Sequence, residues 1–163
     1  MDKILVNSKE RPYCVYLDKS FKHMLELLYE YRLMDSKVVV IFDYKAYKYH
    51  GALFLDALKD VSVQKYTIRV SEKTKTIETV CKLYQFLYRV NADKNTVIMS
   101  FGGGITGDIV GFVASSYRGG LRFIQVPTTL LASVDSSIGG RVGVNFRDKK
   151  DMIGAIYNPM FRS

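Results

Sequence analysis

The hydrophobic residues of this chain follow two spacings that alternate along the sequence. Residues 21–34 carry apolar side chains every three or four positions, as on one face of a helix, whereas residues 37–42 form a β-branched run typical of a strand buried on both sides. Helices are likewise predicted over 47–58, over 75–90 and from about Gly107 to Ser116. Strand-like runs lie between them at 63–70, 95–101 and 122–126.

Strands that alternate with helices of this length predict an α/β fold of the Rossmann-like kind, with a mostly parallel sheet and helices on both faces. After Val126 the pattern weakens into small polar residues, glycines and charges. We expect loops and short elements around a site there, and no further strand–helix unit. A length of 163 residues fits one compact domain, residues 1–163.

Composition narrows the class of protein. Hydrophobic residues make up 48% of the chain, enough for a core, and the net charge of +8 suits either a small polyanionic ligand or simple surface solubility. The basic residues are scattered, so we expect no nucleic-acid partner. No apolar run has the length of a membrane span, and the N-terminus lacks a signal-peptide pattern. Cys14 and Cys81 lie far apart and form no CxxC motif. We therefore expect a cytoplasmic protein with no membrane partner.

The segment SFGGGITGD, residues 100–108, follows a predicted strand directly and precedes a predicted helix. Glycines allow close approach of a ligand to the backbone, and a helix N-terminus offers free N–H groups to an anion such as a pyrophosphate. The pattern is not the standard GxGxxG fingerprint, so a tight turn explains it equally well. Asp108 is either a favourable charge at the helix N-terminus or an acceptor for ribose hydroxyls. Thr128 and Thr129, after the next strand, are either N-caps or ligand contacts.

Three segments together resemble the nucleotide-binding domain of the 3-dehydroquinate synthase family: GGGITGDIVGFVASSYRGG, RFIQVPTTLLASVDSSIGGRVGVN and KKDMIGAIYNP. Upstream, SEKTKT resembles the family's GE-x-x-K-[TS] segment, with Ser71 in place of the glycine. IFDYKAY resembles the family's D-x-N segment, in which Asp43 matches and Lys45 replaces the asparagine.

The resemblance implies a set of site residues. Contacts to NAD are implied for Asp43, Ser71, Glu72, Lys75, Gly103, Gly104, Ile105, Thr106, Gly107, Asp108, Thr128, Thr129, Arg141 and Lys150, and catalytic roles for Asp135, Arg141, Lys150 and Asp151. Three positions depart from the family. Arg141 stands where the family has lysine, Asp151 where it has asparagine, and Gly119 where it has arginine, which here is the preceding Arg118. These departures leave the exact substrate open.

The reaction implied by the resemblance is conversion of 3-deoxy-arabino-heptulosonate 7-phosphate to 3-dehydroquinate and phosphate, in the shikimate pathway of aromatic amino acid biosynthesis. Such enzymes use NAD and a divalent metal, zinc or cobalt, whose glutamate and two histidine ligands belong to a helical C-terminal domain. His23 and His50 stand in no metal-ligand motif. We therefore expect that domain and its metal site to be absent from this chain, which is either a fragment or a naturally short relative.

The isolated chain is predicted to be inactive, and the full-length protein to form a homodimer that acts on a sugar-acid phosphate. Three other functions remain open as hypotheses. They are another sugar-phosphate cyclase, a metal-dependent glycerol or alcohol dehydrogenase domain, and a non-catalytic nucleotide-binding module.

Overall fold

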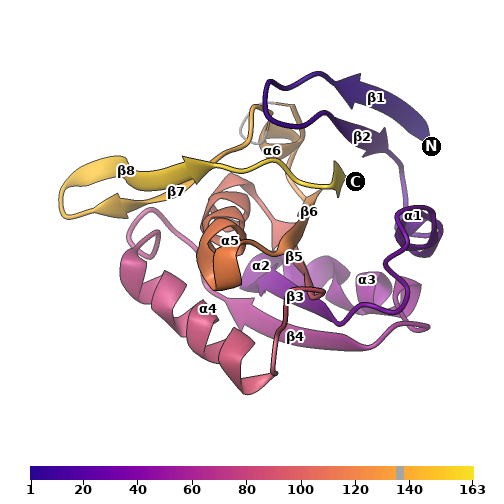
Figure 1. The fold of residues 1–163 in the computed structure, drawn as a ribbon, viewed down its shortest axis with the longest axis horizontal. Coiled ribbons are helices and arrows are strands. Elements are labelled where there is room, and N and C mark those ends of the chain that lie inside the picture. Colours follow the sequence, from indigo (N-terminus) through magenta and orange to yellow (C-terminus); the bar gives the residue numbers. More distant parts are fainter. Residues whose placement is uncertain (135–137) are drawn as a thin grey trace.

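The computed structural model of the chain describes residues 1–134 and 138–163. Its main feature is a sheet in the strand order β1-β2-β9-β6-β5-β3-β4 (Figure 1). The strands are β1 (Asp2–Val6), β2 (Tyr13–Leu17), β3 (Val38–Asp43), β4 (Val63–Ile68), β5 (Val97–Gly102), β6 (Arg122–Pro127) and β9 (Phe161–Arg162). β1 and β2 pair antiparallel, and every other neighbouring pair of this sheet is parallel. The predicted mostly parallel sheet is confirmed.

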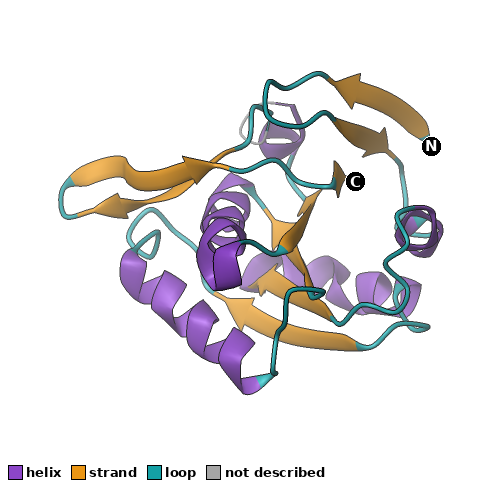
Figure 2. Ribbon diagram, viewed as in Figure 1, coloured by secondary structure: helices purple, strands orange, loops and turns teal. Residues whose placement is uncertain are grey.

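Helices cover both faces of the sheet (Figure 2). They are α1 (Met24–Glu30), α2 (Tyr44–Ala46), the π-helical turn η1 (Tyr47–Gly51), α3 (Ala52–Ala57), α4 (Ile77–Arg89), α5 (Gly104–Ser116), the 3₁₀ turn η2 (Tyr117–Gly119) and α6 (Leu130–Val134). Buried side chains of α1 and α3 share one hydrophobic cluster with β3 and β5, and those of α4 and α5 share a second cluster with the same strands. This two-sided arrangement confirms the predicted fold class.

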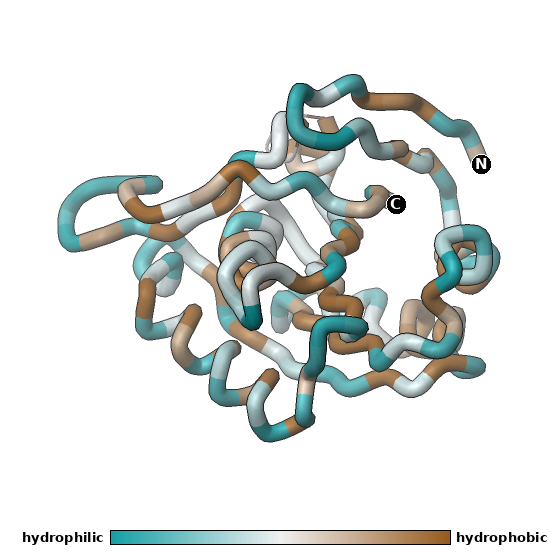
Figure 3. Tube along the Cα trace, in the orientation of Figure 1, coloured by the Kyte–Doolittle hydropathy of each residue, from teal (hydrophilic) through white to brown (hydrophobic). Residues whose placement is uncertain are grey.

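The central strand β3 shows why its sequence had to be apolar throughout. Val38, Val40 and Phe42 point into the cluster with α1 and α3, while Val39 and Ile41 point into the cluster with α4 and α5. All five side chains are fully buried. Successive residues of a strand face opposite sides, so a strand covered on both faces needs a continuous hydrophobic run. The tube coloured by hydropathy shows this concentration along the central strands (Figure 3).

The expectation of loops after Val126 is wrong over two segments. β7 (Arg141–Phe146) and β8 (Lys149–Ile156) form an antiparallel hairpin that packs on α5 and extends from the body of the molecule (Figure 1). β8 exposes most of its side chains, so it lacks the hydrophobic alternation that reveals a strand. The short strand β9 then enters the main sheet between β2 and β6. The strands β1 and β2 were also not anticipated.

Among the described residues, no helix has the length and apolar character needed to span a membrane.

Candidate functional site

The carboxyl ends of the parallel strands β3, β5 and β6 lie at one edge of the sheet, where ligands of open α/β folds bind. Asp43 ends β3 and Gly102 ends β5. The N–H of Thr128, just after β6, donates to the carbonyl of Gly102 at 2.9 Å. A methyl group on Gly102 would lie 2.5 Å from Oγ1 of Thr106 and 2.9 Å from Cβ of Asp43. The packing of these strand ends therefore requires glycine at position 102.

Helix α5 begins at Gly104, earlier than the predicted Gly107, because Gly103 already adopts the N-cap position without any side chain to cap the helix. The N–H groups of the first turn, Gly104 to Thr106, have no acceptor within the helix. A methyl group on Gly103 would meet only the Thr129 side chain, at an ordinary contact distance of 3.5 Å from Cγ2. No described neighbour therefore requires glycine at position 103, although the N–H groups beside it can receive an anion.

Asp108 is the fifth residue of α5, so its interpretation as a charge in the first helical turn is wrong. Its Oδ2 instead accepts a hydrogen bond from Nζ of Lys75 at 2.7 Å, and the same ammonium donates to Oδ1 of Asp151 at 2.5 Å. Lys75 is 4% exposed. A buried ammonium thus joins the 69–76 loop to helix α5 and to strand β8.

The pKa values of Asp108 and Lys75 are both raised. For Asp108 this shift disfavours the charged form, whereas for Lys75 it favours the charged form. Burial raises the pKa of Asp108, and the hydrogen bond and charge of Lys75 offset that effect only in part. Burial lowers the pKa of Lys75, but its hydrogen bonds to Asp108 and Asp151 outweigh burial and leave the pKa raised. The geometry explains the difference. The ammonium of Lys75 contacts two carboxylates, whereas Asp108 shares that ammonium with Asp151.

Asn145 completes the attachment of the hairpin, and the sequence reasoning missed it. Its backbone N–H donates to the Lys75 carbonyl at 2.8 Å, and its side-chain amide donates to the carbonyl and Oε2 of Glu72, each at 3.1 Å. Its Oδ1 accepts the N–H of Asp151 at 2.9 Å. The only signal in the sequence was an amide side chain within an otherwise apolar run.

Arg141 and Lys150, both candidate NAD-binding and catalytic residues, are not brought together by the structure. Arg141 pairs with Ile156 at one end of the hairpin, whereas Lys149 pairs with Phe146 at the other. Arg141 and Lys150 are therefore roughly 13 Å apart along the strand direction. Arg141 lines a cavity of about 570 Å³ together with Asp108 and Asp151. Nζ of Lys150 is exposed and lies 4.0 Å from Oε2 of Glu72.

The remaining candidate residues divide into buried and open positions. Thr106 is fully buried and Gly107 lies against the side-chain amide of Gln125, so neither presents a side chain to solvent. Gly104 and Ile105 are half-buried at the start of α5. Thr129 is exposed, and its hydroxyl accepts the N–H of Ala132 at 3.2 Å, which confirms its interpretation as an N-cap.

Two further candidate residues hold local turns at the same edge. Oδ1 of Asp43 accepts the N–H of Lys45 at 3.4 Å at the start of α2. The N–H of Ser71 donates to the hydroxyl of Thr74 at 2.8 Å. Asp135, a candidate catalytic residue, lies outside the described residues.

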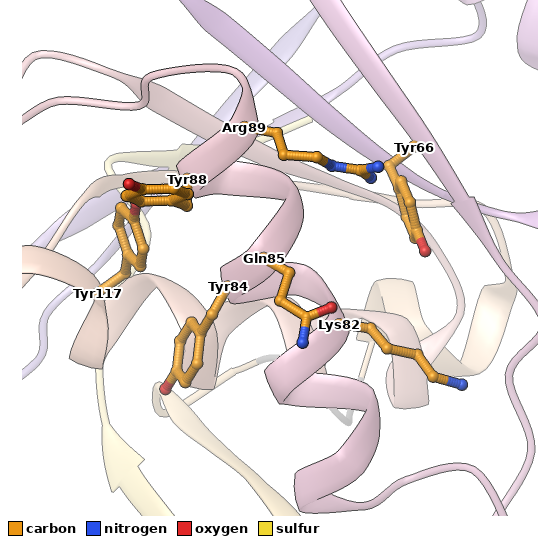
Figure 4. Close-up of a pocket in the computed structure, with 7 residues that line it drawn as sticks. All are labelled: Tyr66, Lys82, Tyr84, Gln85, Tyr88, Arg89 and Tyr117. Atoms are coloured by element: carbon orange, nitrogen blue, oxygen red, sulfur yellow. The ribbon is translucent and has the colours of Figure 1, made fainter.

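A cavity of about 850 Å³ lies away from this edge. It is open and lined by side chains of β4, α4 and η2, with four tyrosines among them (Figure 4). Four of the five lining residues of α4, from Tyr84 to Arg89, lie in its C-terminal half, and helices that follow parallel strands run back toward the amino ends of those strands. We place the functional site at the carboxyl edge, where the acidic and basic groups converge. The described residues contain no group of three or more His, Cys, Asp or Glu placed to hold a metal ion.

Comparison with known proteins shows the family of this chain. A family model described as 3-dehydroquinate synthase N-terminal matches residues 65–162. The 3-dehydroquinate synthases of Clostridium tetani and Acetivibrio thermocellus are both 37% identical over 99% of this chain. The chain covers only 43% and 45% of their lengths, so it spans less than half of these curated relatives.

Solved structures extend the likeness to related cyclases. A crystal structure of 2-deoxy-scyllo-inosose synthase is 25% identical with a TM-score of 0.90 over 99% of this chain and 46% of that one. The 2-epi-5-epi-valiolone synthase of Streptomyces hygroscopicus, solved with NAD⁺ and Zn²⁺ bound, is 26% identical with a TM-score of 0.85 over 96% of this chain and 43% of that one. Glycerol dehydrogenase of Schizosaccharomyces pombe, at 20% identity and a TM-score of 0.66, shares the fold alone. By sequence and by fold, this chain belongs to the 3-dehydroquinate synthase family.

Proposed function

We propose that the chain is the NAD-binding half of a 3-dehydroquinate synthase-like lyase. In the whole protein this enzyme converts 3-deoxy-arabino-heptulosonate 7-phosphate to 3-dehydroquinate and phosphate. The observation that carries the proposal is the junction of β5 and α5. There, among the residues that the structure describes, none requires glycine at position 103, which stands beside backbone N–H groups without helical acceptors. A pyrophosphate satisfies both features.

The residues at the carboxyl edge fit the other parts of a dinucleotide. Asp43, half-buried at the end of β3, is placed to accept hydrogen bonds from ribose hydroxyls. Thr129 faces Gly103 across the junction and adds an exposed hydroxyl. NAD, when bound, supplies the transient oxidation that activates the substrate for loss of phosphate. This chain's own contribution is to bind and orient the dinucleotide.

We further propose that residues 1–163 are an N-terminal domain and that a helical C-terminal domain provides the metal site. Two relatives of known structure were solved with NAD⁺ together with Co²⁺ or Zn²⁺. The described residues of this chain offer no ligand group for such an ion. We propose that the donor set belongs to that C-terminal domain, and that the full-length protein acts in the cytoplasm as a homodimer.

A second candidate function is another sugar-phosphate cyclization. A 2-deoxy-scyllo-inosose synthase solved with carbaglucose-6-phosphate has a TM-score of 0.84 with this chain, so the same frame accommodates a different sugar phosphate. Arg141 and Asp151 both line the 570 Å³ cavity, and both depart from the residues that the family resemblance implies. Turnover by the full-length protein of each sugar phosphate in turn, measured as phosphate release, separates the two candidates.

The cofactor proposal is tested by titrating NAD into the 163-residue chain and its Gly103→Ala variant. Because alanine fits at position 103 at an ordinary contact distance, the melting temperature should stay within about 2 °C of the original. The added methyl group occupies the space proposed for the pyrophosphate, so NAD affinity should fall at least about tenfold. Asp108→Ala should also weaken NAD binding by about tenfold or more, since it removes a charged hydrogen-bond partner.

Equal NAD affinity in the original chain and Gly103→Ala would refute the proposed position of the dinucleotide. The turnover arm uses NAD, zinc and the heptulosonate phosphate. We expect phosphate release from the full-length protein and none from residues 1–163. Release from the 163-residue chain that a chelator abolishes would show that the metal site lies within this chain.

A further inference from the structure

Arg162 is the largest side chain among the fully buried residues of the described chain. It is 1% exposed, and its Nε, Nη1 and Nη2 atoms have no hydrogen-bond partner. Arginine stays protonated in proteins, so this is a buried cation with five unused donors. Buried charges are normally paired and hydrogen-bonded, because removing an ion from water costs more free energy than packing returns. Burial here lowers the pKa of Arg162, and the nearby Tyr13 offsets that effect only in part.

The register of the sheet fixes where this guanidinium lies. Arg162 pairs with Gln125 of β6 on one side and with Val15 of β2 on the other. Its neighbour Phe161 points into the cluster with α1 and α3, so Arg162 points to the opposite face, as Val15 does. Figure 1 shows β9 between β2 and β6, with α6 near their ends.

A cavity of about 130 Å³ adjoins Arg162 at this place. Its wall is formed by Val15, Leu17, Asp18, Pro127, Ser133 and Ser163, among others. The volume is about four times the ~30 Å³ share of one water molecule, enough for a carboxylate or phosphate group. It shares no lining residue with the 570 Å³ cavity at α5 and the hairpin.

Two other polar side chains of this wall, Asp18 and Ser133, already have partners. Oδ1 of Asp18 accepts the N–H groups of Lys19 and Ser20 at 2.7 and 3.3 Å, and its Oδ2 lies 3.7 Å from Nε2 of His23. The hydroxyl of Ser133 donates to the carbonyl of Thr129 at 2.9 Å. The guanidinium is the buried cation of this wall, and its three nitrogen atoms have no hydrogen-bond partner.

We propose that this cavity is an oxyanion-binding site in which Arg162 holds a carboxylate or phosphate group through a two-pronged hydrogen bond. The guanidinium fork matches both kinds of oxyanion in geometry and charge. The inference is independent of NAD binding, since it rests on a different cavity and on different residues.

The test measures the melting temperature of the 163-residue chain against inorganic phosphate and, separately, acetate, at ionic strength held constant with potassium chloride. At ten times the Kd, one of the two anions should raise the melting temperature by about 3–5 °C. Response to phosphate alone identifies a phosphate site, and response to acetate alone or to both identifies carboxylate as an occupant.

The matched variants are Arg162→Met and Arg89→Met. Arg162→Met keeps the length of the side chain without its charge, so it should fold with an unchanged or higher melting temperature and lose the response to anions. Arg89, exposed on α4, serves as the control, and its variant should keep the full response. Should Arg162→Met fail to fold, Arg162→Lys replaces it, with an affinity for the anion that is lower by about tenfold because the two-pronged bond is lost.

Three outcomes overturn the proposal. The first is an equal rise in the melting temperature of Arg162→Met, and the second is no rise in the original chain with either anion. The third is a destabilisation by Asp18→Asn that disappears in the Arg162→Met background, with no response to either anion, because Asp18 would then be the internal partner of Arg162.

Discussion

Replacing Lys75 by methionine should destabilise the fold more than any other single lysine substitution in the 69–76 loop. The side chain of Lys75 is 5% exposed, and its ammonium is shared by Asp108 and Asp151 at 2.7 and 2.5 Å. Methionine fills a similar volume but leaves both carboxylates without their cation. It also removes the ion-pair link between the hairpin and α5, because the ammonium contacts Asp108 of α5 and Asp151 of β8.

The expected loss is about 2–3 kcal/mol of unfolding free energy. Removing one partner of a buried ion pair costs about 3–5 kcal/mol. The value here falls at or below the lower end because water reaches both carboxylates, which are 22% exposed at Asp108 and 66% exposed at Asp151. Asp108 carries most of the loss, since burial already raises its pKa and disfavours its ionised form.

Urea unfolding of the chain at neutral pH measures this loss. Lys73→Met is the matched control, since Lys73 is an exposed lysine of the same loop and should change stability by less than about 0.5 kcal/mol. Adding Asp108→Asn to Lys75→Met should recover about 1 kcal/mol or more, because the amide needs no counter-charge. A Lys75→Met loss no larger than that of Lys73→Met would refute the reasoning that this ammonium holds the cluster together.

Three further predictions concern the same region. The difference in unfolding free energy between the original chain and Lys75→Met should narrow as the pH rises above 10.5. The pKa of Lys75 is raised in the folded chain, so its contribution to stability is present below pH 10.5 and is lost as the pH rises through the folded pKa. Unfolding curves at pH 7 to 12 measure this change. Gly111→Ala should cost about 1–3 kcal/mol in urea unfolding, since the new methyl group would overlap the Val142 side chain and push the hairpin from α5. Asp151→Asn should lower the pKa of Asp108, because the charge of Asp151 raises it, and the carboxyl shift of Asp108 followed by NMR during an acid titration measures the change.

The parts of this fold that the sequence predicted are those where one element is covered on both sides. β3 and β5 are buried on both faces, so their sequences are continuous apolar runs, and α4 carries its buried side chains Val80, Leu83 and Leu87 at helical spacing. The hairpin β7–β8 escaped prediction because only one of its faces packs on α5. β8 therefore mixes exposed charges with half-buried residues.

The sequence likewise predicted only part of the candidate site. The position of Gly102–Gly104 at a strand end followed from the order of strand and helix, and the structure confirms it. The pairing of Lys75 with Asp151 could not be predicted, because the two residues are 76 positions apart and meet only when the hairpin folds back over α5. Asp108 was misplaced in the first helical turn for a local reason. Gly103 acts as the N-cap without a capping side chain, so the true start of the helix left no sequence signal.

The charges around the 570 Å³ cavity bear on the choice of substrate. Asp108, Asp151 and Arg141 line it, and Lys75 lies behind the two carboxylates. Two acidic and two basic groups cancel, so the cavity itself offers a phosphate group little net attraction. An asparagine at position 151, as the family resemblance implies, would leave one positive charge in excess. The aspartate therefore argues against binding of a phosphate group by Arg141. It favours anion binding through the backbone N–H groups at the start of α5, because the first turn of that helix carries no opposing carboxylate.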